Sequence, residues 1–223
     1  MNIQTNKLAK PVKKRPAAPP SARRRAVFPL TPVQQLLWAG IGLVLTIGGT
    51  LMEAAATTMP WLWPEHGLQF QPLGVTYQVG GVLLIGCLGG PWAAAGSQLV
   101  YLALGLAGLA IFTHGGGIDY LQEPTFGYLV GFVPGAWLCA RLAFRYVPTL
   151  EALMASCLAG FTTIHFSGIV YQVALYLASP VDEGMITLGQ GIFKNSIQHL
   201  PAQLAMTCAV AVVAFVVRRI LFY

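Results

Sequence analysis

YLALGLAGLAIFTHGGGIDYLQEPTFGYLVGF, residues 101–132, is the stretch that decides the fold. An apolar helical pattern runs into a glycine-dense turn and out into a second apolar pattern, which predicts a hairpin of two membrane helices. Glycine lets the backbone turn sharply and approach other groups closely. We therefore expect Gly115, Gly116 and Gly117 to form a lid over a small molecule, with a plain turn between two helices as the alternative.

The composition indicates an integral membrane protein. Of the 223 residues, 56% are hydrophobic and only 9% are charged, and a spanning helix needs about 20 mostly apolar residues. The predicted fold class is all-α, with residues 31–223 forming one bundle of six transmembrane helices. These helices are expected near 34–58, 75–90, 92–112, 126–146, 150–178 and 196–218.

Basic residues predict the orientation of this bundle. Eight lysines and arginines precede the first predicted helix, Arg141 and Arg145 end the fourth, and Arg218 and Arg219 end the sixth. Because basic residues near membrane ends are retained in the cytoplasm, we expect both termini inside. The protein is then a multi-pass protein of the cell (inner) membrane, with the glycine lid on its outer face.

Residues 1–30 combine prolines with most of the basic residues. This composition buries too little apolar surface to fold, which predicts a disordered cytoplasmic tail. Its charge is either a topology signal or a contact with anionic membrane lipid or a partner subunit. Nucleic-acid binding is not expected, because the net charge of +6 comes from the tail and the loop ends.

The hairpin resembles the BioY family, the substrate-capture (S) components of energy-coupling-factor (ECF) biotin importers. The family reads roughly YLxLGxxGxPVFAxGxGG and then GPTGGYLxGF. The residues in step are Tyr101, Leu102, Leu104, Gly105, Gly108, Phe112, Gly115, Gly117, Pro124, Thr125, Gly127, Tyr128, Leu129, Gly131 and Phe132. Ala110 replaces the family's proline, and Glu123 and Phe126 replace the glycines beside PT. PLGVTYQ, residues 72–78, resembles the family's P-x-T-x-Q at the mouth of the binding cavity.

The resemblance implies a transporter component that captures biotin and is driven by other subunits, a coupling membrane protein and ATPases. The chain itself has no GxxxxGK[ST] phosphate loop and no series of central carboxylates, so its energy must come from elsewhere. The resemblance also implies that small residues of the first helix dock onto the coupling protein. Ala39, Gly40 and Gly42 are the candidates.

Biotin defines the chemistry that a site must supply. Its ureido ring needs neutral donors and acceptors, its thioether ring needs aromatic walls, and its valerate needs a cation. Hydrogen bonding between helices is the alternative role for these polar side chains. The predicted substrate-binding residues are Thr76, Tyr77, Gln78, Gln98, Tyr101, Asp119, Tyr120, Thr125, Tyr128, Tyr171, Asn195 and His199.

The last helix departs from the family pattern. The family carries an aspartate and, one turn later, a lysine, whereas this chain has His199 and then Ala202 or Gln203. Asn195, His199 and Gln203 are spaced by four, which places them on one face of an α-helix. Lys194 is the cation nearest to this face. A different small vitamin or a biotin-like molecule is therefore the alternative substrate.

No catalytic residue, cofactor or metal site is expected. The four cysteines, Cys87, Cys139, Cys157 and Cys208, fall inside predicted spans without a CxxC pair and are interpreted as small packing residues. The rival function is a membrane enzyme with His165 or His199 as base and Asp119 as orienting acid. A pore-forming facilitator is less favoured, because no polar stripe repeats along several helices.

Small residues also predict how the helices pack. Gly127, Gly131 and Gly135 recur every four residues and share one face of the fourth helix. Such faces let two backbones approach closely. We expect this face to pack inside the bundle rather than against another subunit.

Overall fold

The computed structural model describes residues 31–58, 61, 63–178 and 184–221. Among these, five helices are long and apolar enough to cross a membrane. They are α1 (Pro32–Leu51), α3 (Gln78–Leu106), α4 (Phe126–Ala143), α5 (Leu150–Ala178) and a composite helix, Leu188–Leu221. The composite helix contains the end of α6 (Gly184–Ile192), the π-helix η3 (Phe193–Ile197) and α7 (Leu200–Leu221). The predicted tail, residues 1–30, lies outside the described residues.

The helix α1 begins where its sequence provides a strong start signal. Thr31 accepts a hydrogen bond from the backbone N–H of Gln34, and the Gln34 side chain accepts one from the Thr31 backbone N–H. This reciprocal capping box satisfies two N–H groups that a helix leaves unpaired. Pro32 follows at the first helical position, where a missing N–H costs nothing.

Gly90 divides α3 into two helical segments, residues 78–89 and 91–106. Its φ of 80° and ψ of 168° are not helical, and only glycine adopts such a conformation readily. The two segments lie side by side, since Gly42 of α1 packs against both Ile85 and Ser97. The chain therefore reverses at Gly90, between the two stretches that the sequence predicts as separate helices.

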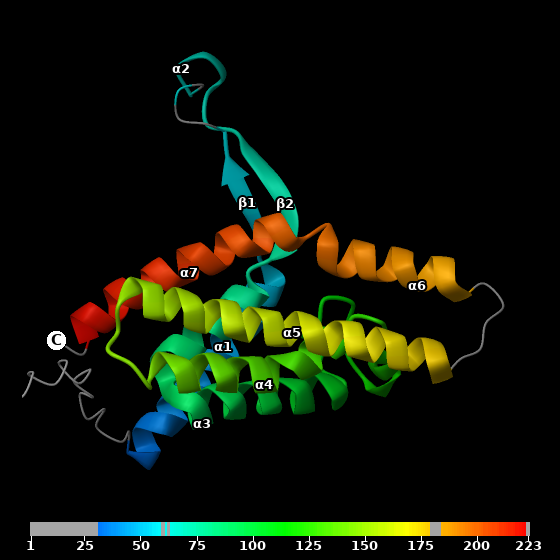
Figure 1. The fold of residues 1–223 in the computed structure, drawn as a ribbon, viewed down its shortest axis with the longest axis horizontal. Coiled ribbons are helices and arrows are strands. Elements are labelled where there is room, and N and C mark those ends of the chain that lie inside the picture. The colour runs from blue at the N-terminus through cyan, green and yellow to red at the C-terminus, as the bar shows by residue number, and fades with distance from the viewer. Residues whose placement is uncertain (1–30, 59–60, 62, 179–183, 222–223) are drawn as a thin grey trace, which may run out of the picture.

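A β-hairpin interrupts the all-α plan, and the sequence-based prediction missed it. The strands β1 (Glu53–Thr57) and β2 (Phe70–Thr76) pair antiparallel and carry the short helix α2 (Trp63–His66) between them. Figure 1 shows this hairpin projecting away from the bundle past α7. The predicted helix 34–58 therefore ends at Leu51, and the predicted helix 75–90 begins at Gln78.

Three other predicted ends differ from the structure. The predicted helix 92–112 ends at Leu106, because the chain turns there into the glycine-rich loop. The predicted helix 126–146 ends at Ala143, and the predicted helix 196–218 lies within the longer composite helix. The predicted helix 150–178 matches α5.

Glycines bring α4 against α5, as predicted for internal packing. A Cβ atom at Gly131 would lie 2.8 Å from the Cβ of Ser167 and 2.9 Å from the Ile164 carbonyl oxygen. Gly127 would meet Tyr171, and Gly135 would lie 2.6 Å from Ile164 Cγ1. The backbones approach so closely that no side chain fits between them, which maximises contact between the helices.

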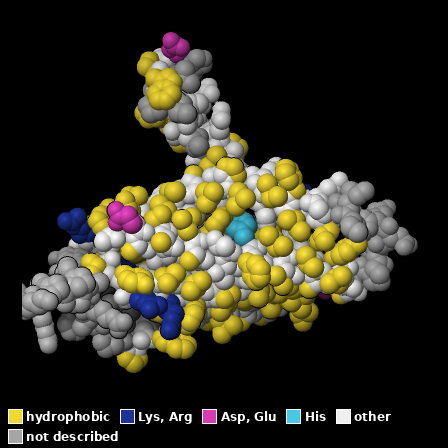
Figure 2. Space-filling model, in the orientation of Figure 1, with side chains coloured by type: hydrophobic (Ala, Val, Ile, Leu, Met, Phe, Trp, Pro, Cys, Tyr) yellow, Lys and Arg dark blue, Asp and Glu magenta, His cyan; other side chains and the backbone are white. Residues whose placement is uncertain are grey.

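The ends of the bundle differ in charge. Arg141 lies in the last turn of α4, and Arg218 and Arg219 lie in the last turn of α7. Arg218 joins these two ends by donating a hydrogen bond to the Ala143 carbonyl, at 2.8 Å. Figure 2 shows hydrophobic side chains along the flank of the bundle and Lys and Arg mainly near this end. The glycine-rich loop precedes α4 and so lies at the opposite end.

Replacing Gly131 by alanine tests the α4–α5 contact. Overpacking a close interface costs about 1–3 kcal/mol, so we expect Gly131→Ala to lower the melting temperature of the detergent-solubilised protein. Gly40→Ala is the matched control, because nothing lies within 4 Å of a Cβ there. The control should melt at or above the wild-type temperature, since alanine favours helix by about 1 kcal/mol over glycine. Equal melting of both variants would contradict the packing assignment.

Candidate functional site

Buried polar side chains from α1 and both segments of α3 meet beneath the glycine-rich loop. The set, called the α1–α3 polar cluster, comprises Thr46, Thr50, Gln78, Gln98 and Tyr101. All five are at most 8% exposed. Gln98 donates to Thr46 Oγ1 at 3.0 Å, which fixes α1 against the second segment of α3. Three predicted site residues, Gln78, Gln98 and Tyr101, are thus brought together.

The Tyr101 hydroxyl is the centre of this cluster. It accepts a hydrogen bond from Gln78 Nε2 at 2.7 Å and donates to the Ile111 carbonyl at 2.9 Å. Thr50 Oγ1 lies 3.3 Å from the same oxygen. One side chain therefore connects α1, both segments of α3 and the loop above them.

The glycine-rich loop, residues 107–125, is compactly folded and is called the lid after its predicted role. Gly108, Gly115 and Gly117 have φ values of 103°, 113° and 104°, a conformation that side chains oppose. Phe112 and Gly115 exchange two backbone hydrogen bonds, of 2.9 and 3.1 Å. Gly116 leaves no room for a Cβ, which would collide with the Leu109 carbonyl oxygen. Glycine is therefore favoured at Gly115 and Gly117 by their positive φ, and at Gly116 because a Cβ atom does not fit.

Aromatic rings fill the space directly beneath the lid. Phe112 is 4% exposed and contacts Tyr101 edge to face, with ring centroids 5.3 Å apart. Tyr120, in the short 3-10 helix η2 (Ile118–Gln122), lies 4.7 Å from Phe112. Phe126 then links this group to Tyr171 of α5, at 5.7 Å. The lid therefore packs against aromatic side chains of its own and of the adjoining helices.

The hydroxyl groups of Tyr120 and Thr125 face each other under the lid and the Tyr120 hydroxyl also lies near the His114 backbone, but neither hydroxyl makes a hydrogen bond of regular geometry within the described residues. Tyr120 is 4% exposed, and its hydroxyl and Thr125 Oγ1 are both shielded from solvent and unsatisfied within the described residues. Burial raises the pKa of Tyr120 above its usual value, so its hydroxyl stays neutral at physiological pH. An unsatisfied buried polar group costs about 1–3 kcal/mol. A ligand with matching donors and acceptors would recover that free energy.

A second polar group, called the histidine cluster, lies between α4, α5, η3 and α7. Its members are Tyr128, His165, Gln172, Ser196 and Gln203. His165 Nε2 lies 2.8 Å from Gln203 Oε1, and Ser196 Oγ lies 2.5 Å from the Tyr128 hydroxyl. Gln172 donates to the same hydroxyl at 3.1 Å. This cluster adjoins the lid through Tyr128 and its neighbour Gln172, beside Tyr171.

The π-helix η3 corrects the predicted face of the last helix. Gln198 donates its backbone N–H to the Phe193 carbonyl, five residues back, at 2.9 Å, so the α-helical spacing of four does not hold here. Ser196 is 3% exposed, whereas Asn195 and His199 are only partly buried. Asn195 is therefore out of α-helical register with His199, whereas His199 and Gln203 stay one α-helical turn apart, since the Gln203 backbone N–H donates to the His199 carbonyl at 3.0 Å. A π-helix leaves no simple signal in the spacing of polar residues.

The other predicted residues are spread over β2, the start of α3, the lid and α5. Thr76 ends β2 and is partly buried, Asp119 is exposed on the lid, and the Tyr171 hydroxyl donates to the Leu121 carbonyl. Tyr77 is 41% exposed and lines a hollow of about 380 Å³ away from the lid. That hollow is an apolar groove between α1, α3 and α7.

Sequence reasoning left Thr46, Thr50 and Ser196 out of the site. Thr46 and Thr50 are one helical turn apart, and each also donates to the carbonyl four residues back. That spacing was a readable signal, because two hydroxyls on one face of an apolar helix need partners. Ser196 could not be identified from the sequence, because the π-helical turn is what directs it into the bundle.

Residues 31–222 match the family model of BioY. The chain belongs to the BioY family. A biotin transporter BioY of Rhizobium etli is 30% identical over 131 residues, 55% of this chain and 70% of that one. The probable biotin transporter BioY of Lysinibacillus sphaericus is 40% identical over 104 residues, which is 46% of this chain and 52% of the relative's length.

A solved structure shares the fold. It is described as the S-component for biotin from an ECF-type ABC transporter, with a TM-score of 0.62 and 19% identity. The match covers 86% of this chain and 95% of that chain. A BioY protein is a transporter component, so the enzyme alternative built on His165, His199 and Asp119 is set aside.

Gly105→Ala tests how the lid of this BioY protein is held closed. A Cβ at Gly105 would overlap the Phe112 ring, so the substitution should displace Phe112 and loosen the loop. We expect faster hydrogen exchange at residues 109–117, measured by mass spectrometry. Gly96→Ala on the same helical segment is the control, because its Cβ would meet nothing within 4 Å. Unchanged exchange in Gly105→Ala would show that Phe112 does not hold the lid.

Proposed function

We propose that this protein is the biotin-binding S component of an ECF importer in the cell membrane. The observation that carries the proposal is the match to the BioY family over residues 31–222. The relatives from Rhizobium etli and Lysinibacillus sphaericus carry biotin transporter names. The basic end of the bundle faces the cytoplasm, and the lid faces outward.

The lid supports capture of a small neutral ring. Tyr120 and Thr125 offer two adjacent neutral hydroxyls that form no hydrogen bond of regular geometry, and a ureido group carries both donors and a strong acceptor. Phe112, Tyr101 and Phe126 supply aromatic walls for the thioether ring. When biotin binds, the aromatic side chains that now fill the space shift to line it.

The valerate end of biotin needs a cation outside this neutral pocket. The family's lysine position in the last helix is Ala202 or Gln203, and Gln203 is held by His165. Lys194 lies in η3, two residues before Ser196 of the histidine cluster, and its side chain is exposed. We assign the valerate carboxylate to Lys194, at the mouth of the site.

Transport requires further subunits. In the described part of the chain, the acidic residues lie in the hairpin, in the lid or at a helix end. The membrane-spanning parts of these helices therefore contain no series of carboxylates that could relay protons. A coupling membrane protein and ATPase subunits supply the energy, and this chain supplies selectivity. Of the predicted docking residues, Ala39 and Gly40 of α1 offer the docking face, since nothing lies within 4 Å of a Cβ at Gly40, whereas Gly42 packs against Ile85 and Ser97 inside the bundle.

A binding screen tests the substrate. Purified protein in detergent should bind biotin in isothermal titration calorimetry and should not bind thiamin or riboflavin. Tyr120→Phe removes one unsatisfied hydroxyl and should weaken biotin binding about tenfold, or about 1.4 kcal/mol. Tyr146→Phe, at an exposed position near the basic end, should leave affinity unchanged. Selective binding of another vitamin would overturn the choice of biotin.

A second measurement separates capture from transport. Proteoliposomes that contain only this chain should bind biotin and should not accumulate it. Accumulation should appear when a coupling protein and ATPases from an ECF importer are added with ATP. Uphill uptake by the chain alone would contradict the assigned division of labour.

A further inference from the structure

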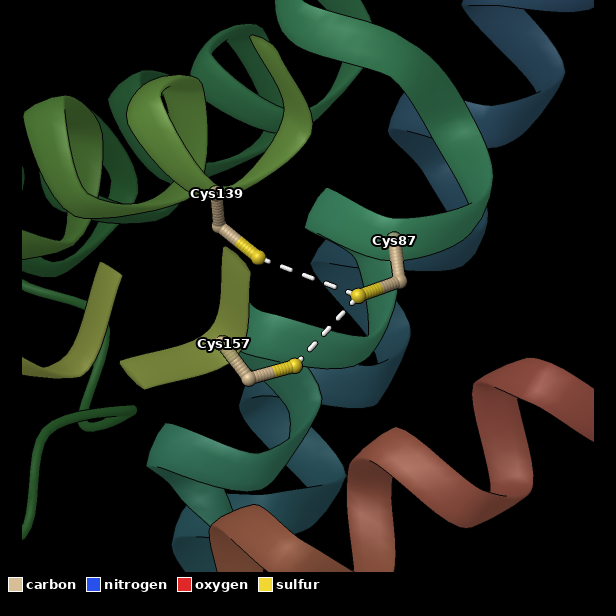
Figure 3. Close-up of side chains that lie close together, drawn as sticks. All are labelled: Cys87, Cys139 and Cys157. Carbon is tan, nitrogen blue, oxygen red and sulfur yellow. Dashed lines mark hydrogen bonds between the residues drawn. The ribbon is translucent and has the colours of Figure 1, made fainter. Parts of the chain in front are cut away.

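We propose that Cys87, Cys139 and Cys157 form a binding site for one copper(I) ion at the centre of the bundle. The three residues come from the first segment of α3, from α4 and from α5. Figure 3 shows the three sulfur atoms directed toward one another from separate helices. The site is remote from the lid and does not depend on the bound vitamin.

The sulfur positions fit a single three-coordinate ion. Cys87 Sγ lies 3.8 Å from Cys139 Sγ and 3.4 Å from Cys157 Sγ, and all three sulfurs lie within 4.8 Å of one another. An ion that lies about 2.3 Å from each of three sulfur atoms, as zinc does from cysteine sulfur, holds them about 4 Å apart. Small side-chain adjustments therefore suffice to bind an ion between them.

Close helix packing builds this arrangement. A Cβ at Gly86 would lie 3.1 Å from Cys139 Sγ, and a Cβ at Gly160 would lie 2.8 Å from Cys139 Cβ. The glycines on α3 and α5 thus admit the Cys139 side chain between the two helices. All three cysteines are 0% exposed, so water does not compete for the sulfurs.

The ligand set selects a soft ion of low coordination number. Thiolate sulfur favours copper(I), zinc and iron–sulfur clusters. Structural zinc is almost always bound by four ligands, whereas only these three cysteines form a potential metal-binding group in the described part of the chain. Copper(I) is satisfied by three sulfurs and has the smallest charge of these ions, which suits a site enclosed in the bilayer.

The local charge also favours a monovalent ion. A buried charge is costly unless an opposite charge offsets it. If two thiols release their protons to solvent and the third stays protonated, the copper(I) complex carries one negative charge. Arg218 is 6% exposed and donates to the Ala143 carbonyl, one helical turn beyond Cys139 in α4. Its positive charge balances that of the complex.

An enclosed ion would have a structural effect. Because the sulfurs come from three helices, one ion links α3, α4 and α5 at a level below the polar clusters. Metal binding to such a site adds its binding free energy to the stability of the fold.

Copper titration tests the site. Protein purified without oxygen is mixed with copper(I) under ascorbate, then treated with a chromophoric copper(I) chelator. We expect one copper per chain to resist the chelator and the melting temperature to rise. Cys87→Ser should lower copper affinity at least tenfold. Cys208→Ser is the control that should retain full binding, because Cys208 is exposed and lies outside the group.

X-ray absorption of the copper-loaded wild-type protein identifies the copper ligands directly, without a variant that could misfold. The proposal requires three sulfur neighbours at about 2.3 Å. Nitrogen ligands, fewer than three sulfurs, or complete removal of copper by the chelator would overturn it, and the thiols would then be packing residues. Loss of copper in Cys208→Ser would equally overturn it.

Discussion

The Tyr101 hydroxyl joins four parts of the chain: α1, the two segments of α3 and the lid. It bonds to Gln78 and Ile111 and lies 3.3 Å from Thr50, and its ring packs against Phe112. Within a bilayer no water can replace these partners. The position of α1, the pairing of the two α3 segments and the closure of the lid are therefore set together, and a change at one of them reaches the others.

Patterns that depend on nearby residues could be read from the sequence. The apolar spans, the glycine-rich turn and the small-residue face of α4 all follow from composition or from spacing along one helix, and the structure contains each of them. The β-hairpin could not be read in this way, because β1 gains its partner only from residues 70–76. The cysteine group is likewise formed by three helices, and its members are 18 or more positions apart in the chain.

The candidate site shows the same division. Gln78, Gln98, Tyr101 and Tyr120 were identified from residue type and resemblance, and they lie beneath or beside the lid. The last helix departs from its predicted spacing at one point, because the π-helical turn buries Ser196 and leaves its neighbour Asn195 only partly buried. An irregular turn of this kind depends on packing against Tyr128 and His165, which no local pattern contains.

The reversal at Gly90 makes the bundle uneven in hydrophobic length. The segment 78–89 rises only about 18 Å, against about 44 Å for the 29 residues of α5, while the hydrocarbon layer is about 30 Å thick. Mismatch between a helix and the bilayer is relieved by tilting or by local thinning of the lipid. Because one side of the bundle is short and the other is long, tilting the whole bundle reduces the hydrophobic mismatch. The thickness of the lipid bilayer therefore helps to set the tilt angle.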